Sequence, residues 1–93
     1  MVDLVRRRVT RAGRDVILTA KEYGVLALLI QHAGQTVSRE QFLDLVWGHA
    51  AFPTTRTVDN HIARLRTRLE PDPAEPRFIL TLPKLGYRLV MEK

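Results

Sequence analysis

The sequence of 93 residues contains no cysteine and no long apolar run. The absence of cysteine excludes disulfides, thiol catalysis and cysteine-ligated zinc, and it fits a reducing compartment. The longest apolar run, Val25 to Ile30, has six residues, whereas a membrane-spanning helix needs about 20. The first residues carry arginines in place of an apolar segment, so we expect no signal peptide, no membrane insertion and a cytoplasmic location.

Groups suited to catalysis or metal binding are also scarce. The three histidines, His32, His49 and His61, do not follow a metal-ligand spacing. The sequence has neither a glycine-rich phosphate loop nor a G-x-S-x-G motif. We therefore expect no enzyme, no cofactor and no metal site, and we interpret His61 as a hydrogen-bonding or surface residue.

Positive charge, in contrast, is abundant. Lysine and arginine number 15 against 10 acidic residues, which gives a net charge of +5 and a pI near 10.4. Such an excess in a small domain indicates a polyanionic partner. Charge alone does not distinguish DNA, RNA and an acidic membrane surface. The length is sufficient for one domain, residues 1–93, and too short for two.

Local signals predict a small N-terminal sheet, three helices and a C-terminal hairpin. A turn at Ala12-Gly13 separates short strand candidates, and T-x-x-E and S-x-x-Q capping boxes begin at Thr19 and Ser38. Pro71 ends the third helix. The predicted ranges are 2–18 for the sheet, about 20–33, 38–47 and 56–70 for the helices, and 78–91 for the hairpin. This order predicts an α+β fold.

Each helix carries apolar residues at helical spacing, which we expect to face the core. In the first helix they are Tyr23, Leu26, Ala27 and Ile30, in the second Phe42, Leu45 and Val46, and in the third Val58, Ile62, Leu65 and Leu69.

The remaining surface of the third helix is rich in arginine. An arginine fork matches a phosphate or a guanine edge, and asparagine can pair with an adenine edge. This face is suited to nucleic acid, although a solvated arginine-rich surface would have the same composition. Five further arginines lie between Arg6 and Arg14. We interpret them as the solvated outer face of the sheet in preference to a phosphate-binding ribbon.

Four blocks of sequence carry a family resemblance: LTAKEY at 18–23, VSREQFLDLVWG at 37–48, RTVDNHIARLRTRLE at 56–70 and LGYRL at 85–89. In this order and spacing they resemble the DNA-binding effector domain of OmpR/PhoB-family two-component response regulators. The resemblance covers nearly the whole chain. It implies a winged helix-turn-helix that binds double-stranded DNA sequence-specifically in transcriptional regulation, with the third helix in the major groove and the hairpin wing on the backbone or in the minor groove.

The resemblance also implies roles for individual residues. The positions expected to read bases are Asp59, Asn60 and Arg64. The positions expected to contact the DNA backbone are Arg39, Trp47, Arg56, Thr57, His61, Arg66, Lys84 and Tyr87. For Trp47, a place at the edge of the core is the alternative interpretation.

Three positions depart from the family pattern. Pro83 stands where the family wing has an arginine that can enter the minor groove, and Lys84 replaces a turn glycine. Lys84 is therefore a candidate for a phosphate contact in place of the minor-groove arginine. Ala63 occupies a position that is often charged or polar in the family, which removes one possible backbone contact.

The resemblance further implies partners beyond a single duplex. They are direct-repeat DNA bound by a head-to-tail dimer, RNA polymerase through the loop 49–55, and a receiver domain of a longer parent protein. No phosphorylation site is predicted within these residues. The alternative function is a winged-helix module that binds protein and has no DNA role. Exposed apolar anchors on the outward face of the third helix would favour that alternative.

Overall fold

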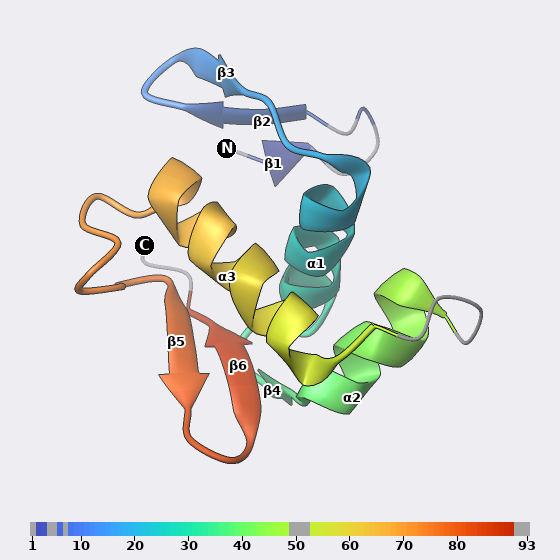
Figure 1. Cartoon of the computed structure of the whole chain (residues 1–93). Helices are drawn as coiled ribbons and strands as arrows, with labels where there is room; N and C mark the ends of the chain where they lie inside the picture. The colour runs from blue at the N-terminus through green and yellow to red at the C-terminus, as the bar shows by residue number, and fades with distance from the viewer. Residues whose placement is uncertain (1, 4–5, 7, 49–52, 91–93) are drawn as a thin grey trace.

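The computed structural model of the protein describes residues 2–3, 6, 8–48 and 53–90 (Figure 1). The helices are α1 (Ala20–Gln31), α2 (Arg39–Phe42), which continues into a π-helical turn, η1 (Leu43–Trp47), and α3 (Thr55–Leu69). The strands are β1 (Val2–Asp3), β2 (Arg8–Arg11), β3 (Arg14–Val16), β4 (Thr36–Val37), β5 (Ile79–Leu82) and β6 (Gly86–Leu89). In this described part of the chain, helices lie between two small antiparallel sheets, which confirms the predicted α+β fold class.

The bounds of these elements differ from the predicted ranges by one or two residues at their ends. The helices predicted at 20–33 and 56–70 are Ala20–Gln31 and Thr55–Leu69. Position 91 of the predicted hairpin and positions 4, 5 and 7 of the predicted N-terminal sheet lie outside the described residues.

The N-terminal sheet consists of β1, β2 and β3, with β2 in the centre. Arg11 pairs with Arg14 across a two-residue turn, Ala12-Gly13. Both turn residues have positive φ, 52° and 78°, as a type I′ hairpin turn requires. The predicted turn is thus confirmed. Val9 of β2 points inward and is buried, whereas the arginines of the hairpin are exposed.

Helix α1 begins with the predicted capping box. The Thr19 hydroxyl accepts a hydrogen bond from the Glu22 amide (3.1 Å), and the Glu22 carboxylate accepts one from the Thr19 amide (2.9 Å). Of the residues predicted to face the core, Leu26 is buried, Tyr23 and Ile30 are partly buried and pack against the core, and Ala27 is partly buried. The buried residues of α1 are Glu22, Val25, Leu26, Leu28 and Leu29. Residues Val25 to Ile30 are all apolar, so periodicity could not select the face of this helix.

The second helix also begins with its predicted capping box, formed by Ser38 and Gln41. Phe42 is fully buried, but the prediction that Leu45 faces the core was wrong, since Leu45 is 65% exposed. The chain widens into the π-helical turn η1 directly after Phe42. This turn changes the rotation per residue, so the side chain three positions after Phe42 points to solvent.

The second sheet has the order β4-β6-β5. The predicted hairpin forms β5 and β6, while β4, which pairs Val37 with Tyr87, was not predicted. Gly86 makes this pairing possible, because a Cβ at Gly86 would lie 2.1 Å from the Val37 carbonyl oxygen. The wing is therefore attached to the segment that leads into α2.

Helix α3 buries its predicted stripe: Val58, Ile62 and Leu65 are fully buried and Leu69 is partly buried. At its C-terminal end, Glu70 is 1% exposed. Its carboxylate accepts hydrogen bonds from the backbone amides of Arg77, Phe78 and Ile79. One side chain therefore joins the end of the third helix to the first strand of the wing.

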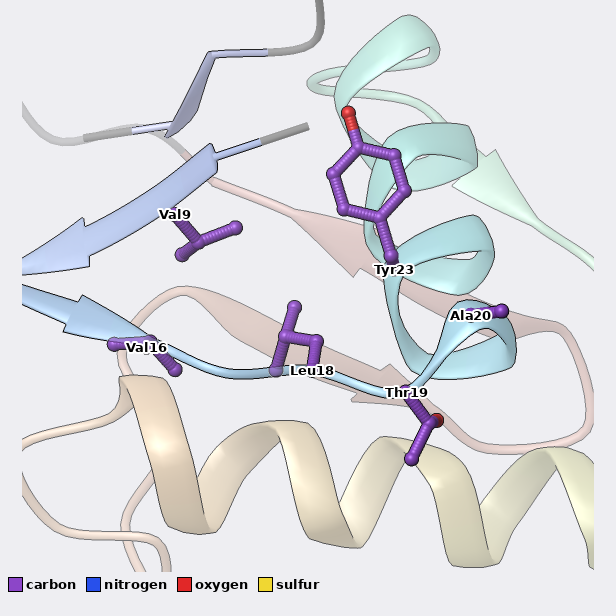
Figure 2. A pocket seen from close by; sticks show the side chains of 6 residues that line it. All are labelled: Val9, Val16, Leu18, Thr19, Ala20 and Tyr23. Carbon is purple, nitrogen blue, oxygen red and sulfur yellow. The ribbon is translucent and has the colours of Figure 1, made fainter. Parts of the chain in front are cut away.

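Helix α3 packs across α1, with its C-terminal end near the N-terminal sheet and its first turn beside the helix that starts at Arg39 (Figure 1). A pocket lies between the N-terminal hairpin and α1 (Figure 2), and its volume is about 150 Å³. Its lining residues are Val9, Val16, Leu18, Thr19, Ala20 and Tyr23. The pocket is smaller than the 300–1,000 Å³ typical of ligand sites, so we interpret it as a packing defect beneath the sheet.

Candidate nucleic-acid interface

One side of α3 is open to solvent along its whole length. Arg56, Asn60, Ala63, Arg64 and Thr67 are all exposed and recur at i, i+4, i+7, i+8 and i+11, so they form one stripe on the helix. This stripe lies opposite the buried one. Among the described residues, the side chains of Asn60 and Arg64 have no hydrogen-bonding partner. They are therefore free to meet a ligand from outside the domain.

On one flank of this stripe, α3 meets the end of η1. The rings of His61 and Trp47 pack edge to face, with centroids 4.9 Å apart. The Nδ1 atom of His61 lies 2.8 Å from the Thr57 carbonyl oxygen. The Lys21 ammonium lies 5.9 Å from the Trp47 ring and donates a hydrogen bond to the Val46 carbonyl (2.9 Å). This flank is basic and aromatic, and its residues hold one another in place.

On the other flank, α3 meets α2 and the wing. The Oδ1 atom of Asp59 accepts hydrogen bonds from Arg39 Nε (2.8 Å) and from the Tyr87 hydroxyl. Tyr87 is only 4% exposed, and its ring packs edge-on against Phe42. Asp59 and Tyr87, predicted to contact DNA, thus contact each other in this structure.

Arg66 extends this flank to the first strand of the wing. Its guanidinium donates hydrogen bonds to the Ile79 carbonyl (2.8 and 3.1 Å) and to the Thr81 hydroxyl (2.7 Å). It also lies 5.6 Å from the centre of the Tyr87 ring. Arg66 therefore joins the third helix to both strands of the wing.

The tip of the wing is a tight turn. The Leu85 amide donates a hydrogen bond to the Leu82 carbonyl (2.9 Å), and Lys84 has a φ of 67°. Proline followed by a residue with positive φ is the pattern of a type II turn. Lys84 thus adopts the left-handed conformation that glycine favours. Its exposed ammonium stands at the far end of the wing, away from the contacts near Tyr87.

These contacts change the acidity of three groups. Partial burial alone would raise the pKa of Asp59, but the hydrogen bonds from Tyr87 and Arg39 outweigh burial and lower that pKa below 3.8. Burial, with the hydrogen bond to Asp59, raises the pKa of Tyr87 above 10.0. The hydrogen bond to Asp59 also raises the pKa of Arg39. At neutral pH, Asp59 is therefore ionised and Tyr87 is protonated.

The structure arranges the eleven predicted site residues in four places. Arg56, Asn60 and Arg64 lie on the exposed stripe; Trp47, Thr57 and His61 lie on the first flank; Arg39, Asp59, Arg66 and Tyr87 lie on the second; Lys84 lies at the wing tip. Sequence reasoning missed Lys21 and Thr81, because each joins the site from an element distant in sequence. Positions 49–52 of the loop 49–55, predicted to meet RNA polymerase, lie outside the described residues.

A basic, partly exposed helix followed by a β-hairpin that packs beside it defines a winged helix-turn-helix domain. The family described as "Transcriptional regulatory protein, C terminal" matches residues 13–89. The chain belongs to this family and is an effector domain of the OmpR/PhoB response-regulator type, as the resemblance predicted. The family is one of transcription regulators.

Three relatives illustrate the similarity. Sensory transduction protein RegX3 of Mycolicibacterium smegmatis is 38% identical over 88 residues, which are 95% of this chain and 39% of RegX3. Response regulator DrrB of Thermotoga maritima, an OmpR/PhoB homologue, superimposes with a TM-score of 0.89 at 33% identity, over 97% of this chain and 41% of DrrB. The DNA-binding domain of Klebsiella pneumoniae RstA, solved in complex with the RstA box, superimposes with a TM-score of 0.84 at 34% identity. The match covers 96% of this chain and 88% of that domain.

Two further findings concern sites of other kinds. Within the described ranges, no three side chains of histidine, aspartate or glutamate gather where they could hold a metal ion. No helix in the same ranges is both long enough and apolar enough to cross a membrane. The chain spans about two fifths of RegX3 and DrrB. The activities of those whole proteins are therefore not assigned to it by this similarity.

Proposed function

We propose that this domain binds double-stranded DNA sequence-specifically, with α3 in the major groove and the wing along the backbone. The observation that carries the proposal is the exposed stripe of α3, which presents Arg56, Asn60 and Arg64 directly opposite the buried Val58, Ile62 and Leu65. A helix of this width fits the major groove of B-DNA, where arginine and asparagine can each pair with a base edge through two hydrogen bonds. The net charge of +5 attracts the duplex.

The proposed roles follow from position. Arg64 and Asn60 lie midway along the stripe and read bases. Residues nearer the flanks and the wing tip contact phosphates, because the two backbones border the groove. These residues are Arg39, Trp47, Thr57, His61, Arg66 and Lys84, together with Arg56 at the N-terminal end of the stripe. Asp59 and Tyr87, which contact each other, are considered in the next subsection.

The arrangement on DNA is also proposed from the family. We infer direct repeats bound head to tail, a receiver domain elsewhere in the parent protein, and contact with RNA polymerase through the loop 49–55. RstA, solved in complex with the RstA box, supports DNA as the partner of this type of domain. The alternative of a protein-binding module is less favourable, because Ala63 is the one apolar side chain on the exposed stripe.

The proposal is tested by selecting duplexes from a random pool and then titrating the domain with the enriched site by fluorescence anisotropy over a salt series. Arg64→Ala should lose about 1–3 kcal/mol on that site and relax specificity at one base pair. Arg56→Ala should weaken all duplexes similarly and make the log–log salt slope shallower by about 0.9.

Arg14→Ala is the matched control, because it removes the same charge from the exposed face of the N-terminal sheet. It should change affinity less than either variant of α3. If the domain enriches no sequence and binds no duplex at low salt, DNA binding by this domain is refuted and the protein-binding alternative becomes the better account.

A further inference from the structure

Three parts of the domain meet at Asp59. This residue lies in the second turn of α3, Arg39 in α2 and Tyr87 in β6. Both partners donate to the same carboxylate oxygen, Oδ1. The partners are 20 and 28 residues away in sequence, so the three-way contact exists only when both helices and the wing are in place.

The Tyr87 ring, like its hydroxyl, has charged neighbours. Two guanidinium groups lie near the ring: that of Arg39 is 5.2 Å and that of Arg66 is 5.6 Å from its centroid. In such cation–π contacts the positive charge is attracted to the electron-rich face of the ring. Arg66 in turn is bound to the carbonyl of Ile79 and the hydroxyl of Thr81. The wing, the recognition helix and α2 therefore share one network of charged and aromatic groups.

Asp59 carries a negative charge although it lies on a surface that is proposed to approach a polyanion. An unpaired carboxylate in this place would repel phosphates, whereas the pair with Arg39 cancels the charge locally. A base-reading aspartate accepts a hydrogen bond from a cytosine amine. The Oδ1 atom of Asp59 already accepts two hydrogen bonds within the domain, so base reading would have to compete with them or use the other oxygen.

We propose that Asp59 is a positioning residue, which fixes the Arg39 guanidinium and the Tyr87 hydroxyl so that α2, α3 and the wing approach DNA as one surface. This inference rests on the proposed function. Arg39 has further N–H groups, and the bond through Nε sets the direction in which they point. Asp59 then acts on the affinity for every duplex and not on the choice of one base.

The test compares Asp59→Asn with the wild-type domain in affinity, base preference and salt slope. We expect Asp59→Asn to weaken binding to the enriched site and to random duplexes by the same factor, about 3- to 10-fold, with an unchanged preference at every base pair. The log–log salt slope should become shallower by about 0.9, because Arg39 loses one phosphate contact. A loss of folded protein alone would leave that slope unchanged.

Two further variants complete the design. Tyr87→Phe keeps the packed ring and removes only the hydroxyl, so it should fold and show a similar loss; in the Asp59→Asn background it should add little, because the two residues act together. Asp44→Asn removes the same charge from an exposed position of η1 and should not weaken binding.

Three results would overturn the assignment. One is lost preference at a single base pair, which would mean that Asp59 reads a base. Another is tighter binding of all duplexes by Asp59→Asn, as by Asp44→Asn, which would mean that only charge matters. The third is full additivity of Asp59→Asn and Tyr87→Phe. Failure of the wild-type domain to bind any duplex would refute the proposed function itself, and it is distinguished from all three by the wild-type titration.

Discussion

Gly86 is the position in the wing where one added methyl group should cost the most stability. A Cβ there would lie 2.1 Å from the Val37 carbonyl oxygen and 2.9 Å from Ser38 Cα. Both are backbone atoms, which no side-chain rotation can remove. The φ of Gly86 is 141°, a conformation that other residues adopt only at a cost of about 1–3 kcal/mol. Gly86→Ala therefore combines backbone strain with a steric clash.

The clash can be relieved only if β4 moves away from β6. That movement would weaken the pairing of Val37 with Tyr87 and open the core beside a fully buried valine. We expect a total loss of about 3 kcal/mol or more in the free energy of unfolding. For a domain of this size, 3 kcal/mol corresponds to a fall in Tm of roughly 12–24 °C. A loss of about 3 kcal/mol is a large part of the free energy of unfolding usual for small domains.

The measurement is urea unfolding followed by the fluorescence of the single tryptophan, with Gly13→Ala as the matched control. Gly13 also has a positive φ, 78°, but a Cβ there would have no neighbour within 4 Å. Gly13→Ala should therefore lose only the backbone term, about 1–2 kcal/mol. Equal losses in the two variants would refute the reasoning, because they would show that the contact with β4 adds nothing at Gly86.

Three other perturbations have defined outcomes. Lys84→Gly should raise the free energy of unfolding by about 0.5 kcal/mol, because glycine adopts the left-handed conformation at less cost than lysine. The same variant should make the salt slope of DNA binding shallower. A lower free energy of unfolding would contradict the turn geometry. Glu70→Gln should lose about 1–3 kcal/mol in urea unfolding, because one amide oxygen replaces a carboxylate that serves three amides, whereas exposed Glu75→Gln should change stability by less than 0.5 kcal/mol. Because the folded-state pKa of Asp59 is lowered, its charge stabilises the domain above about pH 3.8, and this advantage over Asp59→Asn should shrink as the pH falls below 3.8. Because the pKa of Tyr87 is raised, the wild type should lose stability relative to Tyr87→Phe above about pH 10 in the same unfolding series. If the free energies of unfolding of the wild type and the variants changed with pH in parallel, both assignments would be contradicted.

Features that depend on neighbours in sequence could be predicted well. The capping boxes at Thr19 and Ser38 use residues three positions apart, so a short motif contains the whole interaction. The stripe of α3 was found because polar residues separate its apolar positions, which makes the buried face unambiguous. The turn at Ala12-Gly13 was marked by its glycine.

Features that depend on tertiary contacts could not be predicted. Strand β4 has two residues, too few to show an alternating pattern. The need for glycine at position 86 becomes visible only in the folded wing, where β4 packs against it. The exposed Leu45 results from a π-helical turn, for which the sequence carries no recognised signal. The contact of Asp59 with Arg39 and Tyr87 joins segments that periodicity treats separately, so sequence reasoning could place Asp59 on the helix surface without finding its partners.

The hydrogen bonds of Glu70 have a mechanical consequence. Its carboxylate accepts hydrogen bonds from the first amides of the wing at the end of α3, so these contacts oppose any change in the distance between the wing and α3. A protein with a flexible wing could adjust to grooves of different width. This domain would instead keep the distance between α3 and the wing constant. Duplexes whose groove dimensions match that distance would be favoured, even at base pairs that no side chain touches.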